Sequence, residues 1–276
     1  MRVYLIVVFT SFLMLTSCAN KQEVQKKEAE ARLNSISNLI QNNTYNAAKI
    51  QIDSIHLLYP HLIKIREKAQ EFQDTITRRE STRSLMYCDS LLSVKQLEFK
   101  NLQQRFKLEK DKKYQTIGNY IHKSQLVENN IGRTFLNAYV DEQANYYLVS
   151  TYCGEKLSHC SVKVSVGDVY CQTDTIKTNN AFNHSFTDGE LRWEEVTFKN
   201  DKEHGVSAFL AQYQNQSIKV LLLGNKIHDY SLSNRDKLAI IETYNLWVVM
   251  KDLQQLKSQT KKLKFKISQI NKHKSK

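Results

Sequence analysis

The residues best suited to redox or metal chemistry lie in one segment of the chain: Cys153, His159, Cys160 and Cys171. Cys153 and Cys160 flank what we expect to be a hairpin loop, so they are a candidate disulfide in an oxidising compartment, and Cys171 could compete for either partner. The three thiols and His159 could instead bind zinc, although the paired Cys-x-x-Cys spacing of common structural sites is missing. Because spacing does not fix pairing, free packed thiols are the third interpretation.

A second set of reactive residue types is Asn183, His184, Ser185 and Asp188, which together resemble the components of a hydrolytic triad. Triads are defined by geometry rather than by clustering in sequence, and no Gly-x-Ser-x-Gly turn accompanies this set. We therefore expect a polar surface loop here.

Glu194 and Glu195 are adjacent on a predicted strand, so they should point to opposite faces and could not act as a facing acid–base pair. The sequence contains no phosphate-cradling glycine loop and no His-Glu-x-x-His motif. We therefore expect no catalytic residues, no metal and no cofactor, and the prediction is that the protein is not an enzyme.

The N-terminus has the organisation of a signal peptide. Arg2 precedes an apolar stretch, residues 3–14, that is shorter than the about 20 residues of a membrane-spanning helix. Small residues then lead to Cys18 in the run Leu-Thr-Ser-Cys. In one interpretation this is an ordinary secretory signal, and Cys18 follows it only by chance.

This run resembles the lipobox of bacterial lipoproteins. The resemblance implies that residues 1–17 are removed as a signal peptide and that Cys18 carries acyl chains such as palmitate, which anchor the protein in a membrane. By resemblance to the enterobacterial sorting rule, Ala19 after the cysteine favours the outer membrane. The lipidated protein would belong to the cell envelope, facing either the periplasm or the cell surface.

The composition favours long helices and a basic surface. The 276 residues include one proline and seven glycines, and many are Lys, Gln, Glu or Leu, which are good helix formers. The net charge of +12 could attract lipid headgroups or acidic polysaccharide. We expect no nucleic acid as a partner outside the cytoplasm.

The first part of the mature chain is predicted to be helical. Residues 18–28 form a polar tether, and residues 29–60 form a helical hairpin that ends at Pro60. Tyr45, Ala48, Ile55 and Pro60 stand at the offsets of the second helix of a tetratricopeptide repeat, so the hairpin resembles one such unit. A plain helical hairpin is the alternative, and either would need another surface to cover its apolar face.

Two longer stretches carry coiled-coil patterns. In residues 61–115, Leu85, Leu92, Phe99 and Phe106 recur every seven residues, with Cys88 as a small core residue. In residues 233–273 the apolar positions alternate by three and four, and they are Leu246, Val249, Leu253, Leu256, Thr260, Leu263, Ile267 and Ile270. We expect these stretches to be the two arms of a long antiparallel coiled-coil stalk, through which oligomers could also form.

Residues 133–232 alternate with period two between turn residues, which is typical of antiparallel strands. The expected strands are residues 134–140, 145–152, 161–166, 191–198, 206–213 and 217–223. The predicted fold class is therefore α+β, with a small antiparallel β-sandwich or open barrel inserted between the stalk helices.

Four serine and threonine residues follow an aspartate and precede an apolar residue: Ser54, Thr75, Ser90 and Thr175. This pattern resembles the acceptor motif for O-glycosylation of envelope proteins in some Gram-negative anaerobes. A polar helix face that borders an apolar stripe would produce the same pattern.

Taken together, the order of elements resembles that of lipoproteins common in such anaerobes. The leading hypothesis is a non-enzymatic envelope lipoprotein that binds an unknown protein or glycan through its β-domain. A structural or assembly subunit of an envelope complex is the second hypothesis, and an enzyme of unrecognised type is the third.

Overall fold

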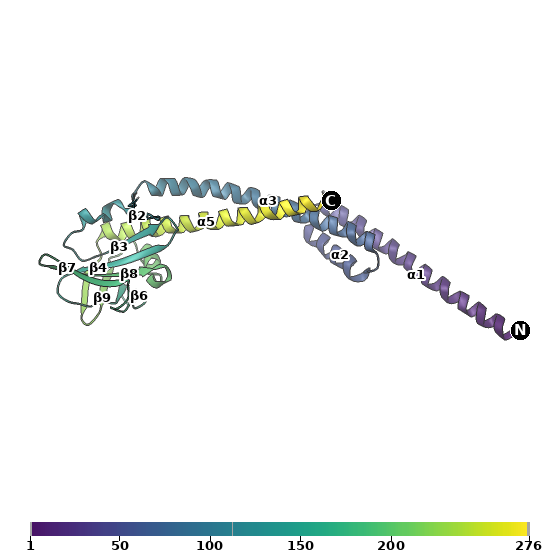
Figure 1. Ribbon diagram of the computed structural model, residues 1–276, viewed down its shortest axis with the longest axis horizontal. Coiled ribbons are helices and arrows are strands. Elements are labelled where there is room, and N and C mark those ends of the chain that lie inside the picture. Colours follow the sequence, from purple (N-terminus) through teal and green to yellow (C-terminus); the bar gives the residue numbers. More distant parts are fainter. Residues whose placement is uncertain (1, 112, 275–276) are drawn as a thin grey trace. The chain divides into compact units, whose positions relative to one another are not determined.

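A computed structural model describes residues 2–111 and 113–274, with side chains placed for residues 21–111 and 113–272. Over this range the protein is mixed α+β, with five α-helices and two antiparallel sheets (Figure 1). The chain divides into two compact units: unit 1 is Met1–Asp89 with Gln259–Lys276, and unit 2 is Ser90–Ser258. The expected α+β class and the long C-terminal helix are confirmed.

Unit 1 is built from α1 (Arg2–Gln41), α2 (Tyr45–Leu58), the first part of α3 (Ile63–Gln103) and the last part of α5 (Asn234–Lys274). Asn43, with a positive φ of 57°, allows the tight turn between α1 and α2. The buried residues of α1 and α2 form one cluster with Ile65, Ala69 and Ile76 of α3. Helix α3 thus covers the apolar face that the hairpin could not bury alone.

Helix α1 continues through residues 18–28, where we expected a tether. The segment consists largely of good helix formers, and Lys27 pairs with Glu23 one turn earlier at 3.5 Å. Cys18 lies outside the residues whose side chains are described. Among the residues searched, no helix is long and apolar enough to cross a membrane.

Unit 2 contains both sheets. The strand order in the larger sheet is β1 (Phe106–Glu109), β2 (Asn119–His122), β3 (Phe135–Asp141), β4 (Tyr146–Cys153), β8 (Leu191–Lys199) and β7 (Asn183–Asp188). The order in the smaller sheet is β10 (Ile227–Ser231), β9 (Lys219–Leu223), β5 (Ser161–Val166) and β6 (Val169–Gln172). All pairings are antiparallel among the described strands.

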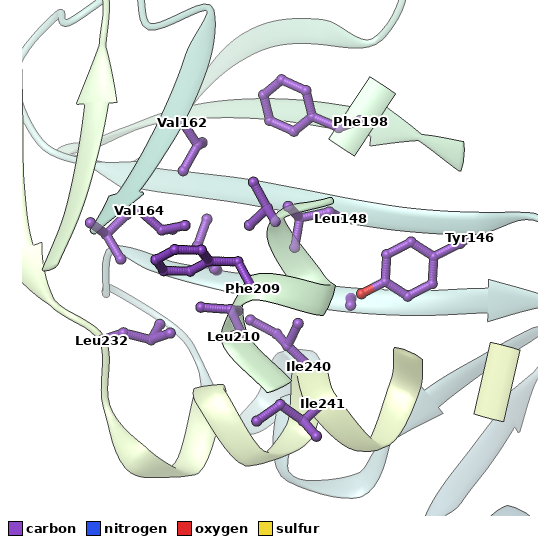
Figure 2. Close-up of a cluster of buried hydrophobic side chains, with 14 of the residues drawn as sticks. Tyr146, Leu148, Val162, Val164, Phe198, Phe209, Leu210, Leu232, Ile240 and Ile241 are labelled. Carbon is purple, nitrogen blue, oxygen red and sulfur yellow. The ribbon is translucent and has the colours of Figure 1, made fainter. Parts of the chain in front are cut away.

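One hydrophobic core serves both sheets and two helices of unit 2 (Figure 2). Leu148 and Phe198 come from the larger sheet, and Val162 and Val164 come from the smaller one. Helix α4 (Val206–Gln212) and the first turns of α5 add buried residues to the same cluster. Each large apolar side chain buried here contributes about 1.5–3 kcal/mol, so this core fixes the strands that carry polar side chains at the sheet edge.

The strand expected at residues 206–213 is wrong, because this segment forms α4. Val206, Phe209 and Leu210 are buried at helical spacing rather than in alternation. Glu203 accepts hydrogen bonds from the backbone N–H groups of Gly205 and Ser207, at 3.0 and 2.7 Å, and so satisfies donors at the start of the helix.

The first long helix ends earlier than predicted. Helix α3 stops at Gln103 rather than near residue 115, and Phe106 is buried on β1 instead of continuing the helical stripe. The pairing of β1 with β2 means that the β-structure begins about 27 residues before the expected boundary at 133. Cross-strand pairing with β2, the next strand in the chain, therefore overrides the helical pattern.

Helix α5 turns its predicted apolar stripe inward in both units, with Leu246, Val249, Leu253 and Ile270 buried. Within unit 2, Lys95 of α3 forms an ion pair with Asp252 of α5 at 3.0 Å, and Arg105 pairs with Glu242. A step of ten residues forward in the chain, from Lys95 to Arg105, thus corresponds to a step of ten residues backward along α5, from Asp252 to Glu242.

Candidate functional site

A polar cavity of about 880 Å³ lies in unit 2 beside β7 and β8. Loops 156–160, 175–179 and 224–225 supply the rest of its lining. Three of the lining side chains are cations, Lys156, Lys177 and Arg192, and Glu194 is the carboxylate among the described lining residues. Hydroxyl and amide groups make up most of the remainder, so the cavity suits a polar ligand that carries negative charge.

Arg192 and Ser185 face the cavity from neighbouring strands. Arg192 donates to the Ser185 hydroxyl at 3.3 Å and lies 3.8 Å from Glu194. The Nε of Arg192 is buried and has no hydrogen-bond partner within the described residues. The Arg192 side chain as a whole is half-buried and lines the cavity, so its remaining N–H donors are suited to a ligand carboxylate or phosphate.

Glu194 holds the loop that forms one wall of the cavity. Its carboxylate accepts hydrogen bonds from the backbone N–H groups of Leu157, Ser158 and His159 at 2.8, 2.8 and 3.0 Å. Gly224 lies behind this loop, and a Cβ there would lie only 2.6 Å from the carbonyl oxygens of Leu157 and Ser158. The wall is therefore packed too closely for any residue other than glycine at this position.

The same carboxylate is the end of a buried hydrogen-bonded chain. His159 Nδ1 lies 3.1 Å from Glu194, and His159 Nε2 lies 3.1 Å from the Ser150 hydroxyl. These are the residue types and the order of a Ser-His-acid triad, but the Ser150 and His159 side chains are fully buried on the core side of the sheet. A substrate could not reach Ser150, so this hydrogen-bonded chain of side chains serves as a structural support for the loop.

Burial and hydrogen bonding determine the charge states of His159 and Glu194. Burial lowers the pKa of His159 below its ordinary value, although the hydrogen bond to Glu194 acts in the opposite direction. Burial alone would raise the pKa of Glu194, but the hydrogen bonds from the loop and from His159 outweigh it and lower this pKa. A neutral His159 therefore donates from Nδ1 to an ionised Glu194 and accepts from Ser150 at Nε2.

Cys153, Cys160 and Cys171 are free thiols in this structure. Cys160 lines the cavity and its Sγ donates to the carbonyl of Leu223 at 3.4 Å, while the Cys171 thiol donates to the carbonyl of His204 at 3.3 Å. Across the described residues, no three His, Cys, Asp or Glu side chains gather in a way that could hold a metal ion.

Residues 183–188, expected to be a polar loop, form the edge strand β7 instead. His184 and Ser185 are consecutive on this strand, so they point to opposite faces and do not form a reactive pair. Glu194 and Glu195 also lie on opposite faces, as expected: Glu194 is buried, and Glu195 is half-exposed beside His184 at 3.7 Å.

The candidate glycosylation residues lie in different environments. Thr175 lines the cavity, and Ser90 is exposed on α3. The Ser54 and Thr75 hydroxyls donate to backbone carbonyls of their own helices, at 2.8 and 2.9 Å. Cys88 is buried on α3, and its Sγ lies 3.8 Å from Gln259 within unit 1.

This cavity was not predictable from sequence patterns, because its three cations are scattered over 37 positions and two of them lie in irregular loops. Glu194 was recognisable only as a strand residue, and its partners lie 35 to 37 residues earlier in the chain. No protein-family model, curated protein sequence or solved structure matches this chain.

Proposed function

We propose that the protein is a lipid-anchored lipoprotein of the cell envelope, and that its unit 2 is a non-enzymatic binding module. Cys18 carries the acyl anchor, in the outer membrane, and the cavity takes a negatively charged partner. The observation that supports binding most strongly is the polar cavity with Lys156, Lys177 and Arg192 in its lining. Cations gathered around a concave polar surface attract an anionic ligand and orient it.

The rigidity of the cavity wall supports binding rather than reaction. Glu194 fixes the loop at residues 157–159 through three backbone hydrogen bonds, so the cavity needs little ordering when a ligand enters. The Ser-His-acid chain beside the cavity ends at Ser150, which is fully buried. A second such chain, Ser124–His122–Glu242, contributes no residue to the cavity lining. A hydrogen bond from a charged donor to the ligand contributes about 1.5–3 kcal/mol, so two or three such contacts would give a specific complex.

We further propose that α3 and α5 are the arms of an antiparallel coiled-coil stalk and that the two sheets form a sandwich around their shared core. The Lys95–Asp252 and Arg105–Glu242 pairs within unit 2 support the antiparallel direction. The inward heptad stripe of α5 supports continuous packing along the helix. Such a stalk would present the binding module at a distance from its anchor.

Photo-crosslinking in intact cells tests this function. A photoreactive amino acid replaces Thr178, which lines the cavity, and in a matched variant it replaces Tyr114, an exposed residue outside the cavity lining. We expect a discrete crosslinked product from position 178 only, and its loss when Lys177 and Arg192 are both changed to Gln. The same products from both positions, or a product that is indifferent to the charge changes, would contradict the proposal.

A further inference from the structure

Strand β7 is an edge of the six-stranded sheet and pairs, within the described part of the chain, with β8 alone (Figure 1). It is six residues long, and all but its first residue are exposed. Natural edge strands are usually protected by lysine, proline or a short length. Strand β7 contains neither lysine nor proline, whereas the opposite edge strand, β1, is four residues long and carries Lys107.

The register of β7 shows which backbone groups are free for another strand. The Thr197 N–H donates to the Phe182 carbonyl at 2.8 Å, which sets the alternation of hydrogen-bonded pairs along β7 and β8. His184 and Phe186 therefore exchange hydrogen bonds with β8, and Ser185 and Thr187 direct their backbone N–H and C=O groups away from it. These outward groups match the spacing of an additional strand.

The two faces of this edge differ in chemistry. On the cavity side lie Ser185 and Arg192, with Lys177 in the adjoining loop. On the opposite side the rings of Phe186 and Trp193 stack with centroids 6.2 Å apart, and Phe186 is 48% exposed. A strand added here would send alternate side chains to a cationic face and to an aromatic face.

We propose that the partner is an extended polypeptide segment that adds to β7 as a further strand, with acidic side chains on the cavity side and apolar side chains on the Phe186 side. This inference rests on the proposed function of the cavity and names its ligand class. Strand addition provides backbone hydrogen bonds for affinity, and alternate side chains provide specificity. A polyanionic glycan would use the cavity cations but has no need of the outward N–H groups of Ser185 and Thr187.

A selection from a random decapeptide library displayed on phage, against the immobilised full chain in detergent, tests the inference. We expect selected peptides to alternate acidic and apolar residues and to bind in fluorescence anisotropy. The Thr187→Pro variant removes an outward N–H without removing a hydrogen bond to β8, and proline is tolerated at such edge positions. Affinity for the peptide should fall about tenfold or more, whereas Thr187→Val should bind like the wild type.

A change in the peptide gives an independent measurement that leaves the protein untouched. N-methylation of alternate backbone amides should abolish binding in one register and preserve it in the other, because only one set of amides faces β7. Failure to enrich any peptide, or binding that is indifferent to both Thr187→Pro and N-methylation, would overturn strand addition. If binding survives those changes but is lost when Lys177 and Arg192 become Gln, strand addition fails while the anionic cavity stands.

Discussion

Glu194 and His159 are joined at two points: one carboxylate oxygen of Glu194 lies 3.0 Å from the backbone N–H of His159 and 3.1 Å from its ring Nδ1. A residue on β8 thereby fixes both the main chain and the side chain of a loop that begins after β4. Because this loop forms a wall of the cavity, the stability of the wall and the charge of Glu194 are coupled.

We predict that Glu194→Gln destabilises unit 2 by about 2–4 kcal/mol, because the amide leaves buried N–H donors without an anionic acceptor. Thermal unfolding followed by circular dichroism would measure the change. Glu195→Gln is the matched control, since Glu195 is the next residue, lies on the opposite face and is half-exposed. Equal effects of the two substitutions would show that Glu194 does not hold the loop.

The stability of unit 2 should fall as the pH drops below the ordinary pKa of histidine, 6.5. Burial lowers the folded-state pKa of His159, so the unfolded chain takes up a proton more readily than the folded one. The stability that neutral His159 contributes is complete above pH 6.5, and it is lost as the pH falls through the folded-state pKa of His159. Glu194, whose folded-state pKa is also lowered, adds to the loss below its ordinary 4.5.

Urea unfolding at about pH 7.5 and about pH 5.5 measures this dependence. We expect the His159→Gln variant to be less stable than the wild type at the higher pH but to lose less stability on acidification. His184→Gln is the control, because His184 is exposed on β7 beside Glu195 and, within the described residues, has no hydrogen bond or ion pair with His159 or Glu194. If the His159→Gln variant loses as much stability on acidification as the wild type, the acid sensitivity comes from another group.

The pairing of α3 with α5 in unit 2 should respond to a charge reversal. Hydrogen bonds to Asp252 and Glu98 raise the pKa of Lys95, so this lysine stays charged at neutral pH. Lys95→Glu should cost about 0.5–1 kcal/mol by placing a third carboxylate beside Glu98 and Asp252, and adding Asp252→Lys should recover most of that loss. A double-mutant cycle in urea measures the coupling, and no recovery would argue against the antiparallel register.

Loss of the anchor should release the protein from membranes. We predict that Cys18→Ala prevents acylation, so that metabolic labelling with radioactive palmitate marks the wild type alone. The variant should move to the soluble or unprocessed fraction, because a lipid chain supplies about 0.8 kcal/mol of membrane affinity per buried CH₂ group. Equal membrane association and labelling of both proteins would place the anchor elsewhere.

The sequence predicted those helices and strands in which apolar residues recur with one clear period. The alternation at residues 145–152 and 161–166 corresponds to β4 and β5, and the three-four spacing from Leu246 onward lies within α5. In each of these patterns the buried side chains recur with one period along the element, so neighbouring residues carry the information.

Elements whose own residues show no clear period, or a misleading one, were missed. Strand β7 has exposed polar residues along its length and exists because it pairs with β8, so its sequence resembles a loop. The segment at residues 206–213 alternates superficially, but Glu203 and Gly205 start a helix there. The cavity depends on three loops that meet only in the folded chain, which is why its cations could not be predicted from spacing.

Lysine footprinting with a membrane-impermeant acylating reagent tests whether a partner occupies the cavity in the envelope. The modification of Lys156 and Lys177 is compared between isolated membranes and purified protein, with the exposed Lys226, which does not line the cavity, as the reference. We expect Lys156 and Lys177 to be protected in membranes relative to Lys226. Equal reactivity of all three lysines in both preparations would contradict it.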